Sequence, residues 1–171
     1  TTPYGAAKAF SQQMTCIYRM AYGLQTCSVI LYNHESPRRG ETFVTRKITM
    51  AVANIVKGNQ KEIWMGNLDS IRDWGYAPEY TEGMWRMLQA DSPEDFVLAT
   101  GSAYTIKDFL EFSFAHVGLS WEDYVKFDPK FLRPTEVDEL IGDASKAERV
   151  LGWKASVLPP ELARIMVDAD I

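Results

Sequence analysis

The chain has 171 residues, of which 46% are hydrophobic and 24% charged, a composition that suits a globular protein with one sizeable core. Its net charge of −5 argues against general nucleic-acid binding, and no apolar run approaches the roughly 20 residues of a membrane helix. Cys16 and Cys27 lack metal-type spacing and are expected to be reduced thiols of a cytoplasmic protein. With only two histidines, no metal site is expected.

The first predicted element is a helix with a tyrosine and a lysine on one face. Tyr4 and Lys8 are four residues apart, a spacing that makes two side chains neighbours on a helix. An ammonium held beside a phenol favours the phenolate, so the pair can serve in proton transfer at neutral pH. The alternative is an exposed structural pair, because this two-residue motif recurs by chance. The apolar positions of the helix are Ala7, Phe10, Met14, Ile17 and Ala21, and Gly23 follows as its stop.

A buried strand is predicted at residues 28–32, and the polar residues 33–40 after it are expected to form a loop. In open α/β sheets, ligands bind beyond the carboxyl ends of strands, which makes this loop a candidate site. Asn33 can donate and accept hydrogen bonds, His34 can hydrogen-bond, and two adjacent arginines can hold a phosphate. The alternative is a solvated, proline-containing turn.

The rest of the chain alternates between helix and strand signals, which predicts an α/β architecture. Thr105 and Asp108 have the spacing of a capping box at the start of a helix. Residues 119–134, with mixed aromatic and charged side chains, are expected to be irregular. Further helices are expected near residues 48–55, 80–88, 105–117, 143–151 and 160–169, with short strands at 62–65 and 96–99.

No glycine-rich dinucleotide-binding turn can be written in this chain. Its 11 glycines never lie closer together than eight residues, whereas the Rossmann fingerprint places three glycines within six positions. A P-loop is absent as well. Because a catalytic helix is rarely the first element of an enzyme, we expect the chain to be the back half of a longer protein.

Several segments together resemble the extended short-chain dehydrogenase/reductase superfamily and, within it, the GDP-mannose 4,6-dehydratase family. The run Asn-His-Glu-Ser-Pro-Arg-Arg-Gly at residues 33–40, followed by Phe-Val-Thr-Arg-Lys at 43–47, is highly specific for that family. Pro-Tyr-Gly-Ala-Ala-Lys at 3–8 and Leu-Gly-Trp at 151–153 are shared more widely. The resemblance extends from one end of the chain to the other.

The resemblance implies a fold and a reaction. The α/β fold would combine the C-terminal part of an NAD(P)-binding Rossmann-like domain, residues 1–34, with a smaller substrate-binding domain. That second domain would be mainly residues 35–171, with some segments of about 60–100 returning to the Rossmann sheet. The family converts GDP-mannose to GDP-4-keto-6-deoxymannose with bound NADP, and the full-length enzyme would be a homo-oligomer, a dimer or tetramer.

The resemblance also implies roles for individual residues. Bidentate guanidinium groups suit a diphosphate, and a carboxylate suits a ribose diol. Catalytic roles fall to Tyr4 and Lys8, cofactor contacts to Tyr4, Lys8, His34 and Arg39, and substrate contacts to Asn33, Val44, Lys47, Arg72, Arg133 and Glu136.

Other features of the family have no counterpart in the chain. The catalytic threonine and glutamate that precede the tyrosine in the family are absent, as is the glycine-rich motif. We therefore expect the fragment alone to be inactive and the apolar stripe of its first helix to lack partners. Two alternatives stay open: another extended short-chain enzyme acting on a nucleotide sugar, such as an epimerase or reductase, or a non-catalytic GDP-sugar-binding fragment.

Overall fold

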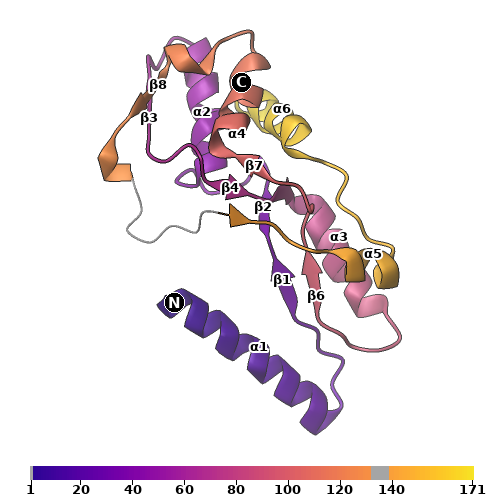
Figure 1. Cartoon of the computed structure of the whole chain (residues 1–171). Coiled ribbons are helices and arrows are strands. Elements are labelled where there is room, and N and C mark those ends of the chain that lie inside the picture. Colours follow the sequence, from indigo (N-terminus) through magenta and orange to yellow (C-terminus); the bar gives the residue numbers. More distant parts are fainter. Residues whose placement is uncertain (1, 132–138) are drawn as a thin grey trace.

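The computed structural model describes residues 2–131 and 139–171, and it has the mixed α/β fold that the sequence predicts (Figure 1). Its helices are α1 (Pro3–Tyr22), α2 (Val44–Val56), α3 (Ala77–Gln89), α4 (Ile106–Ala115), α5 (Ser145–Leu151) and α6 (Pro159–Asp170). Its strands are β1 (Val29–Leu31), β2 (Asn33–Glu35), β3 (Ile63–Met65), β4 (Ile71–Arg72), β5 (Trp74–Tyr76), β6 (Phe96–Leu98), β7 (Tyr104–Thr105), β8 (Val125–Phe127) and β9 (Glu139–Leu140).

Local signals set the ends of several helices. At the start of α1 the side chain of Thr2 accepts a 3.1 Å hydrogen bond from the Gly5 amide. The helix ends at Gly23, whose φ of 64° is a left-handed conformation that glycine adopts without strain. The capping box predicted for α4 is confirmed: Thr105 accepts from the Asp108 amide at 3.0 Å, and Asp108 accepts from the Thr105 amide at 2.8 Å.

Short parallel ladders join segments that are distant in the sequence. β1 pairs with β6, so that Val29 lies opposite Phe96, and β2 pairs with β5, so that Asn33 lies opposite Trp74. β3 pairs with β8 in the same way, while β4 lies between antiparallel β7 and parallel β9. Parallel pairing requires a crossover connection, and α2 and α3 lie within these crossovers.

Two predictions about irregular segments are wrong. Residues 33–40 do not form a loop throughout, because Asn33–Glu35 forms β2 and its backbone pairs with Trp74–Tyr76. Residues 119–134 are not irregular throughout either, because Val125–Phe127 forms β8 on β3. In both cases the partner strand is far away in the sequence, so the local pattern does not reveal it.

Buried side chains gather in two clusters. The larger lies among α2, α4 and α6 with β3 and β5, where the rings of Trp74 and Phe109 are 5.4 Å apart. The smaller lies among α3, α5 and β6, where Trp153 meets Tyr80 edge-on at 5.5 Å. Figure 1 shows α2, α4 and α6 together at one end of the molecule and α3 and α5 beside β6. β5 contacts both α6 of the larger cluster and α3 of the smaller one, and its partner β2 also contacts α3.

Helix α1 stands apart from both clusters (Figure 1). None of its described side chains is buried; Phe10 is 64% and Ile17 50% exposed, and Met14 is half-buried. The apolar stripe of α1 therefore lacks partners within the described residues, as the sequence predicts. The division of the chain at residues 34 and 35 stays a prediction.

Candidate functional site

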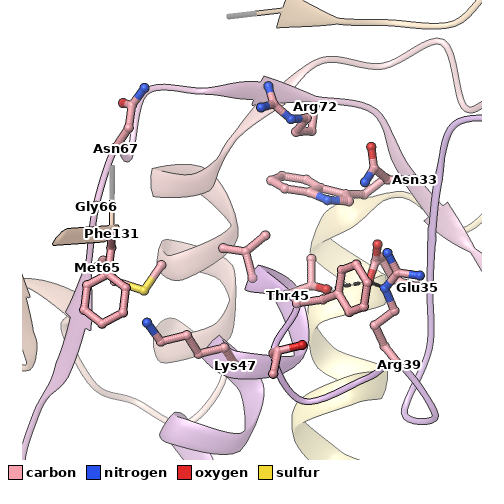
Figure 2. A pocket seen from close by; sticks show the side chains of 14 residues that line it. Asn33, Glu35, Arg39, Thr45, Lys47, Met65, Gly66, Asn67, Arg72 and Phe131 are labelled. Atoms are coloured by element: carbon pink, nitrogen blue, oxygen red, sulfur yellow. Dashed lines mark hydrogen bonds and ion pairs between the residues drawn. The ribbon is translucent and has the colours of Figure 1, made fainter. Parts of the chain in front are cut away.

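A cavity of about 320 Å³ lies between the end of β2 and the start of α2 (Figure 2). Five residues that the sequence singles out line this cavity, although they belong to different segments. They are Asn33 of β2, Arg39 of the following loop, Val44 and Lys47 of α2, and Arg72 of β4. The structure thus brings together every predicted substrate residue that it describes, and adds Arg39.

Two cations of this cavity are held by backbone carbonyls. The Lys47 ammonium donates to the Trp64 carbonyl at 2.5 Å and lies 4.1 Å from the centre of the Phe131 ring. Burial, and then the like charge of Lys130, lower the pKa of Lys47. Arg72 donates to the carbonyl of the preceding residue at 2.7 Å. Cationic groups concentrated in a concave site favour an anionic ligand such as a phosphate.

A buried carboxylate holds the third cation of the cavity. Glu35 is 2% exposed, accepts a 2.5 Å hydrogen bond from the Thr45 hydroxyl, and pairs with Nε of Arg39 at 3.2 Å (Figure 2). Burial raises the pKa of Glu35, although Thr45 and the charge of Arg39 oppose the shift. The Arg39 guanidinium also lies 3.7 Å from the centre of the Phe43 ring. Arg39 is therefore fixed against the wall by an acid and an aromatic ring.

A second cavity, of about 620 Å³, lies between α1 and β1. Tyr4 and Lys8 of α1 line it together with His34 of β2. The Lys8 ammonium is 5.3 Å from the centre of the Tyr4 ring, so it lies over the aromatic face, and the Tyr4 side chain is 72% exposed. A phenol, an ammonium and an imidazole around one cavity are groups that can move protons.

Strand β2 separates the two cavities. Successive side chains of a strand point to opposite faces, and here Asn33 and Glu35 line the first cavity while His34 lines the second. Nδ1 of His34 lies 2.9 Å from the Tyr32 carbonyl, and its ring stacks on that of Tyr80 at 5.5 Å. These contacts fix the imidazole at the second cavity.

Arg39 does not line the same cavity as His34, although both are predicted cofactor contacts. Both are cofactor contacts by resemblance, yet Arg39 lines the first cavity and His34 the second. The physical reason is the ion pair with Glu35 and the contact with the Phe43 ring, which turn Arg39 toward α2. Its role as a cofactor contact stays a prediction. Arg133 and Glu136 lie outside the described residues.

Sequence reasoning missed three residues that line the first cavity or support it. Glu35 lies two positions after Asn33, and β2 places both residues on one face, but the sequence pattern of this segment predicts a loop. Thr45 lies between the predicted residues Val44 and Lys47 in the first turn of α2. Phe131, which lies under the Lys47 ammonium, has no signal in the sequence.

Metal-ligand clusters and membrane-spanning helices are absent from the described residues. There, no group of three or more histidine, cysteine, aspartate or glutamate side chains is placed to hold a metal ion. No helix in the same part of the chain combines the length and apolar character needed to span a bilayer. Cys16 and Cys27 are both free thiols.

Solved structures share this fold along almost the whole chain. RMD from Pseudomonas aeruginosa, complexed with NADPH, matches with a TM-score of 0.91 at 17% identity, over 99% of this chain and 56% of that one. A UDP-glucose 4-epimerase from Thermotoga maritima matches with a TM-score of 0.82 at 24% identity, over 99% and 53%. Likeness at these identities shows the fold alone, which is a Rossmann-like α/β fold.

Sequence comparison defines the family within that class. The family model of GDP-mannose 4,6 dehydratase matches residues 1–166. GDP-mannose 4,6 dehydratase 1 of Arabidopsis thaliana is 52% identical over 170 residues, 99% of this chain and 47% of the relative. The Homo sapiens GDP-mannose 4,6 dehydratase is 47% identical over 187 residues, 99% of this chain and 50% of the relative. The chain therefore belongs to the GDP-mannose 4,6-dehydratase family, and it spans about half the length of the curated relatives it matches.

Proposed function

We propose that the full-length protein containing this chain is a GDP-mannose 4,6-dehydratase, a lyase that converts GDP-mannose to GDP-4-keto-6-deoxymannose with bound NADP. The observation that supports this most directly is the convergence of Asn33, Val44, Lys47 and Arg72 on one cavity. These four residues are the described members of the substrate set that the resemblance implies. Family membership gives independent support.

The first cavity is the proposed site of the GDP part of GDP-mannose, and the mannose would extend past β2 to Tyr4 at the second cavity. Arg72 would bind the pyrophosphate, with Asn33 beside it, and Val44 and Lys47 would lie at the guanine end. The cationic side chains of this cavity offer local positive charge for a diphosphate on a chain whose net charge is −5. Two further contacts, to the pyrophosphate and the ribose, are proposed from the resemblance alone, for Arg133 and Glu136.

The second cavity suits the nicotinamide-ribose end of NADP. The Tyr4 hydroxyl, the Lys8 ammonium and the His34 imidazole reach its wall and can hydrogen-bond ribose hydroxyls. When bound, NADP would supply the redox chemistry at the sugar. Tyr4 would take the proton of the sugar C4 hydroxyl, and Lys8 would stabilise the phenolate and hold the ribose. The glycine-rich cradle for the pyrophosphate would come from elsewhere in the full-length protein.

The assembly and location of the protein are further parts of this proposal. We propose a homo-oligomer, dimer or tetramer, in which the loop carrying Arg38 and Arg39 reaches a cofactor bound mainly by another subunit. Arg38 is exposed, which leaves it accessible for such a contact. A cytoplasmic location suits the two free thiols, Cys16 and Cys27, because reducing compartments preserve thiols.

The deciding experiment is product analysis on the full-length protein with GDP-mannose and NADP. We expect a GDP-sugar that has lost one water and carries a 4-keto group, identified by mass spectrometry and NMR. A product of unchanged mass with inverted C4 would show an epimerase instead. Binding of GDP-mannose without any product would show a non-catalytic binding module. The same preparation carrying Tyr4→Phe serves as the control for contaminating activity.

A further inference from the structure

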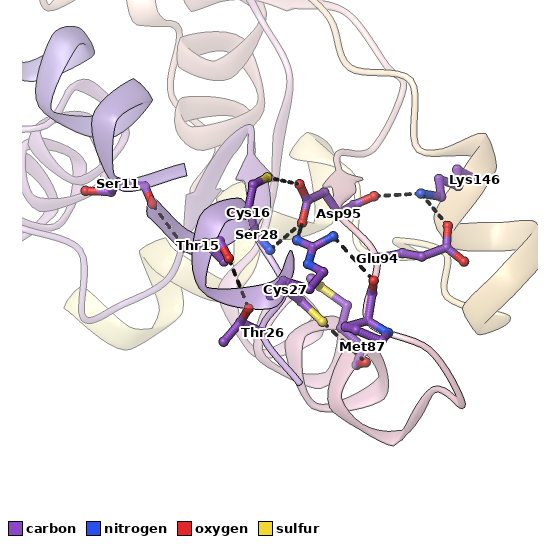
Figure 3. A network of polar contacts seen from close by, with 12 residues as sticks. Ser11, Thr15, Cys16, Thr26, Cys27, Ser28, Met87, Glu94, Asp95 and Lys146 are labelled. Atoms are coloured by element: carbon purple, nitrogen blue, oxygen red, sulfur yellow. Dashed lines mark hydrogen bonds and ion pairs between the residues drawn. The ribbon is translucent and has the colours of Figure 1, made fainter. Parts of the chain in front are cut away.

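Helix α1 carries Tyr4 and Lys8, yet polar contacts of its last turns attach it to the rest of the described chain (Figure 3). The Arg19 guanidinium donates to the Pro93 carbonyl at 3.3 Å and forms an ion pair with Asp95. The Cys16 thiol donates to the other carboxylate oxygen of Asp95 at 3.6 Å. No described side chain of α1 is buried, and within the described residues these polar contacts attach its C-terminal half to the rest of the fold.

Asp95 connects α1 to three further elements. Its Oδ1 accepts a 2.8 Å hydrogen bond from the Ser28 amide, which directly precedes β1. Its carbonyl accepts from the Lys146 ammonium of α5 at 2.9 Å, and its own position directly precedes β6 (Figure 3). Burial acts to raise the pKa of Asp95, but the hydrogen bonds from Ser28 and Arg19 outweigh it, so the pKa is lowered. The carboxylate is therefore charged at neutral pH and holds α1 to the segments that directly precede β1 and β6.

The length of α1 makes the position of Tyr4 sensitive to the attachment at Arg19. Tyr4 lies 15 residues before Arg19, which at 1.5 Å per residue is about 22 Å along the helix axis. A tilt of about 10° at Arg19 would move Tyr4 by about 4 Å, more than the length of a hydrogen bond. A misplacement of about 1 Å can cost a hundredfold in rate. A loose attachment at Arg19 would therefore displace Tyr4 near the other end of α1 and lower the reaction rate.

We propose that Arg19 and Asp95 form a positioning pair that fixes the direction of α1 and hence the place of Tyr4 and Lys8 at the second cavity. The inference rests on the proposed function, because it concerns the same proton-transfer pair. Neither Arg19 nor Asp95 lines either cavity, so both act through the helix. The first cavity includes no residue of α1, so removing the positioning pair should not change its binding of GDP-mannose.

The test compares two arginine variants of the full-length protein. Arg19→Met removes the cation of the positioning pair at similar side-chain length. Arg164→Met is the matched control, because Arg164 pairs with Glu161 and Asp168 within the exposed face of α6. We expect Arg19→Met to lower kcat by about tenfold or more, given the sensitivity of rate to placement, while KM for GDP-mannose stays within about twofold. Arg19→Lys should recover part of kcat, and Arg164→Met should change neither constant.

A second readout does not depend on turnover. Hydrogen exchange of the α1 amides should become faster in Arg19→Met, while exchange in α2, α4 and α6 stays as in the wild type. Product formation by the wild type tests the proposed function separately. Unchanged kcat together with unchanged α1 exchange in Arg19→Met would overturn the positioning pair. The proposal would also be overturned if Arg19→Met lost hydrogen-exchange protection throughout the molecule and Arg19→Lys did not restore it. That pattern would indicate that Arg19 stabilises the whole fold.

Discussion

Thr45 donates a 2.5 Å hydrogen bond to the carboxylate of Glu35, a side chain that is 2% exposed. The bond links β2 to the first turn of α2, so one contact joins two walls of the first cavity. Removing one donor from a buried carboxylate leaves it with part of its desolvation cost uncompensated. The pair should therefore matter for the stability of the fold as well as for the shape of the site.

The first prediction removes this donor. Thr45→Val should destabilise the full-length protein by about 1–3 kcal/mol, because Glu35 would stay buried with one partner fewer. Thr49→Val is the matched control: Thr49 is equally buried, but its hydroxyl donates to the Arg46 carbonyl of its own helix at 3.2 Å. Urea unfolding of both variants is the measurement. Equal losses in the two variants would contradict a special role for the Glu35 contact.

The second prediction concerns the pH dependence of stability. The pKa of Glu35 is raised in the folded state by burial, so the folded state binds this proton more tightly than the unfolded state. The stabilisation from protonation is complete below the unfolded pKa and is lost as pH rises through the folded pKa. Relative to Glu35→Gln, the wild type should therefore lose stability as the pH rises from the usual pKa of a glutamate to the raised pKa of Glu35 in the folded state. Unfolding free energies that change in parallel for the two proteins across this range would contradict the prediction.

The third prediction concerns the proposed pyrophosphate contact. Arg72→Ala in the full-length protein should weaken GDP-mannose binding by roughly 2 kcal/mol or more, the cost of losing a charge-assisted contact. Arg164→Ala removes an arginine that lines neither cavity and should leave affinity unchanged. Isothermal titration of both variants decides. An unchanged affinity in Arg72→Ala would remove Arg72 from the site.

The fourth prediction concerns the proposed base. Tyr4→Phe removes one hydroxyl from a side chain that is 72% exposed, so the fold should not change. Turnover by the full-length protein should fall by about 10²–10⁴-fold, the usual contribution of a general acid–base group, while GDP-mannose binding persists. Steady-state kinetics and titration calorimetry measure the two effects. A variant that keeps more than about a tenth of the wild-type rate would exclude Tyr4 as the base.

The fifth prediction concerns residues 1–171 expressed alone. We expect no turnover of GDP-mannose, no tight NADP binding and a tendency to aggregate. Phe10 at 64% and Ile17 at 50% exposure leave an apolar helix face without a partner among the described residues, and such faces promote association. Light scattering, together with NADP titration, tests this. A soluble monomer that makes the 4-keto product with added NADP would contradict both expectations.

Features set by neighbouring residues could be predicted from the sequence. The end of α1 at Gly23 and the capping box of Thr105 and Asp108 depend on spacings of a few residues, and both are present. β2 and β8 could not be predicted, because each exists only where a distant strand pairs with it. Asn33–Glu35 looks like a polar loop in the sequence until its partner β5 is known.

In the candidate site too, some residues could be predicted from the sequence and others depend on the fold. The resemblance selects Asn33, Val44, Lys47 and Arg72, and the structure places them around one cavity. Glu35 escaped notice because a carboxylate is rarely fully buried without a specific partner, and its partners follow from the fold. The roles of the individual residues stay predictions until ligands are bound.

Side chains of β2 alternate between the two cavities, so the lining of both cavities depends on the number of residues before this strand. Tyr32 is the single residue between β1 and β2, and its amide donates to the Leu98 carbonyl of β6 at 3.1 Å, which fixes the connecting residue against the neighbouring strand. Replacing one side chain in β2 alters one cavity. Inserting or deleting one residue before Asn33 would turn every β2 side chain to the opposite face and exchange the linings of the two cavities. Directed-evolution libraries at this strand should therefore vary residue identity and keep the number of residues constant.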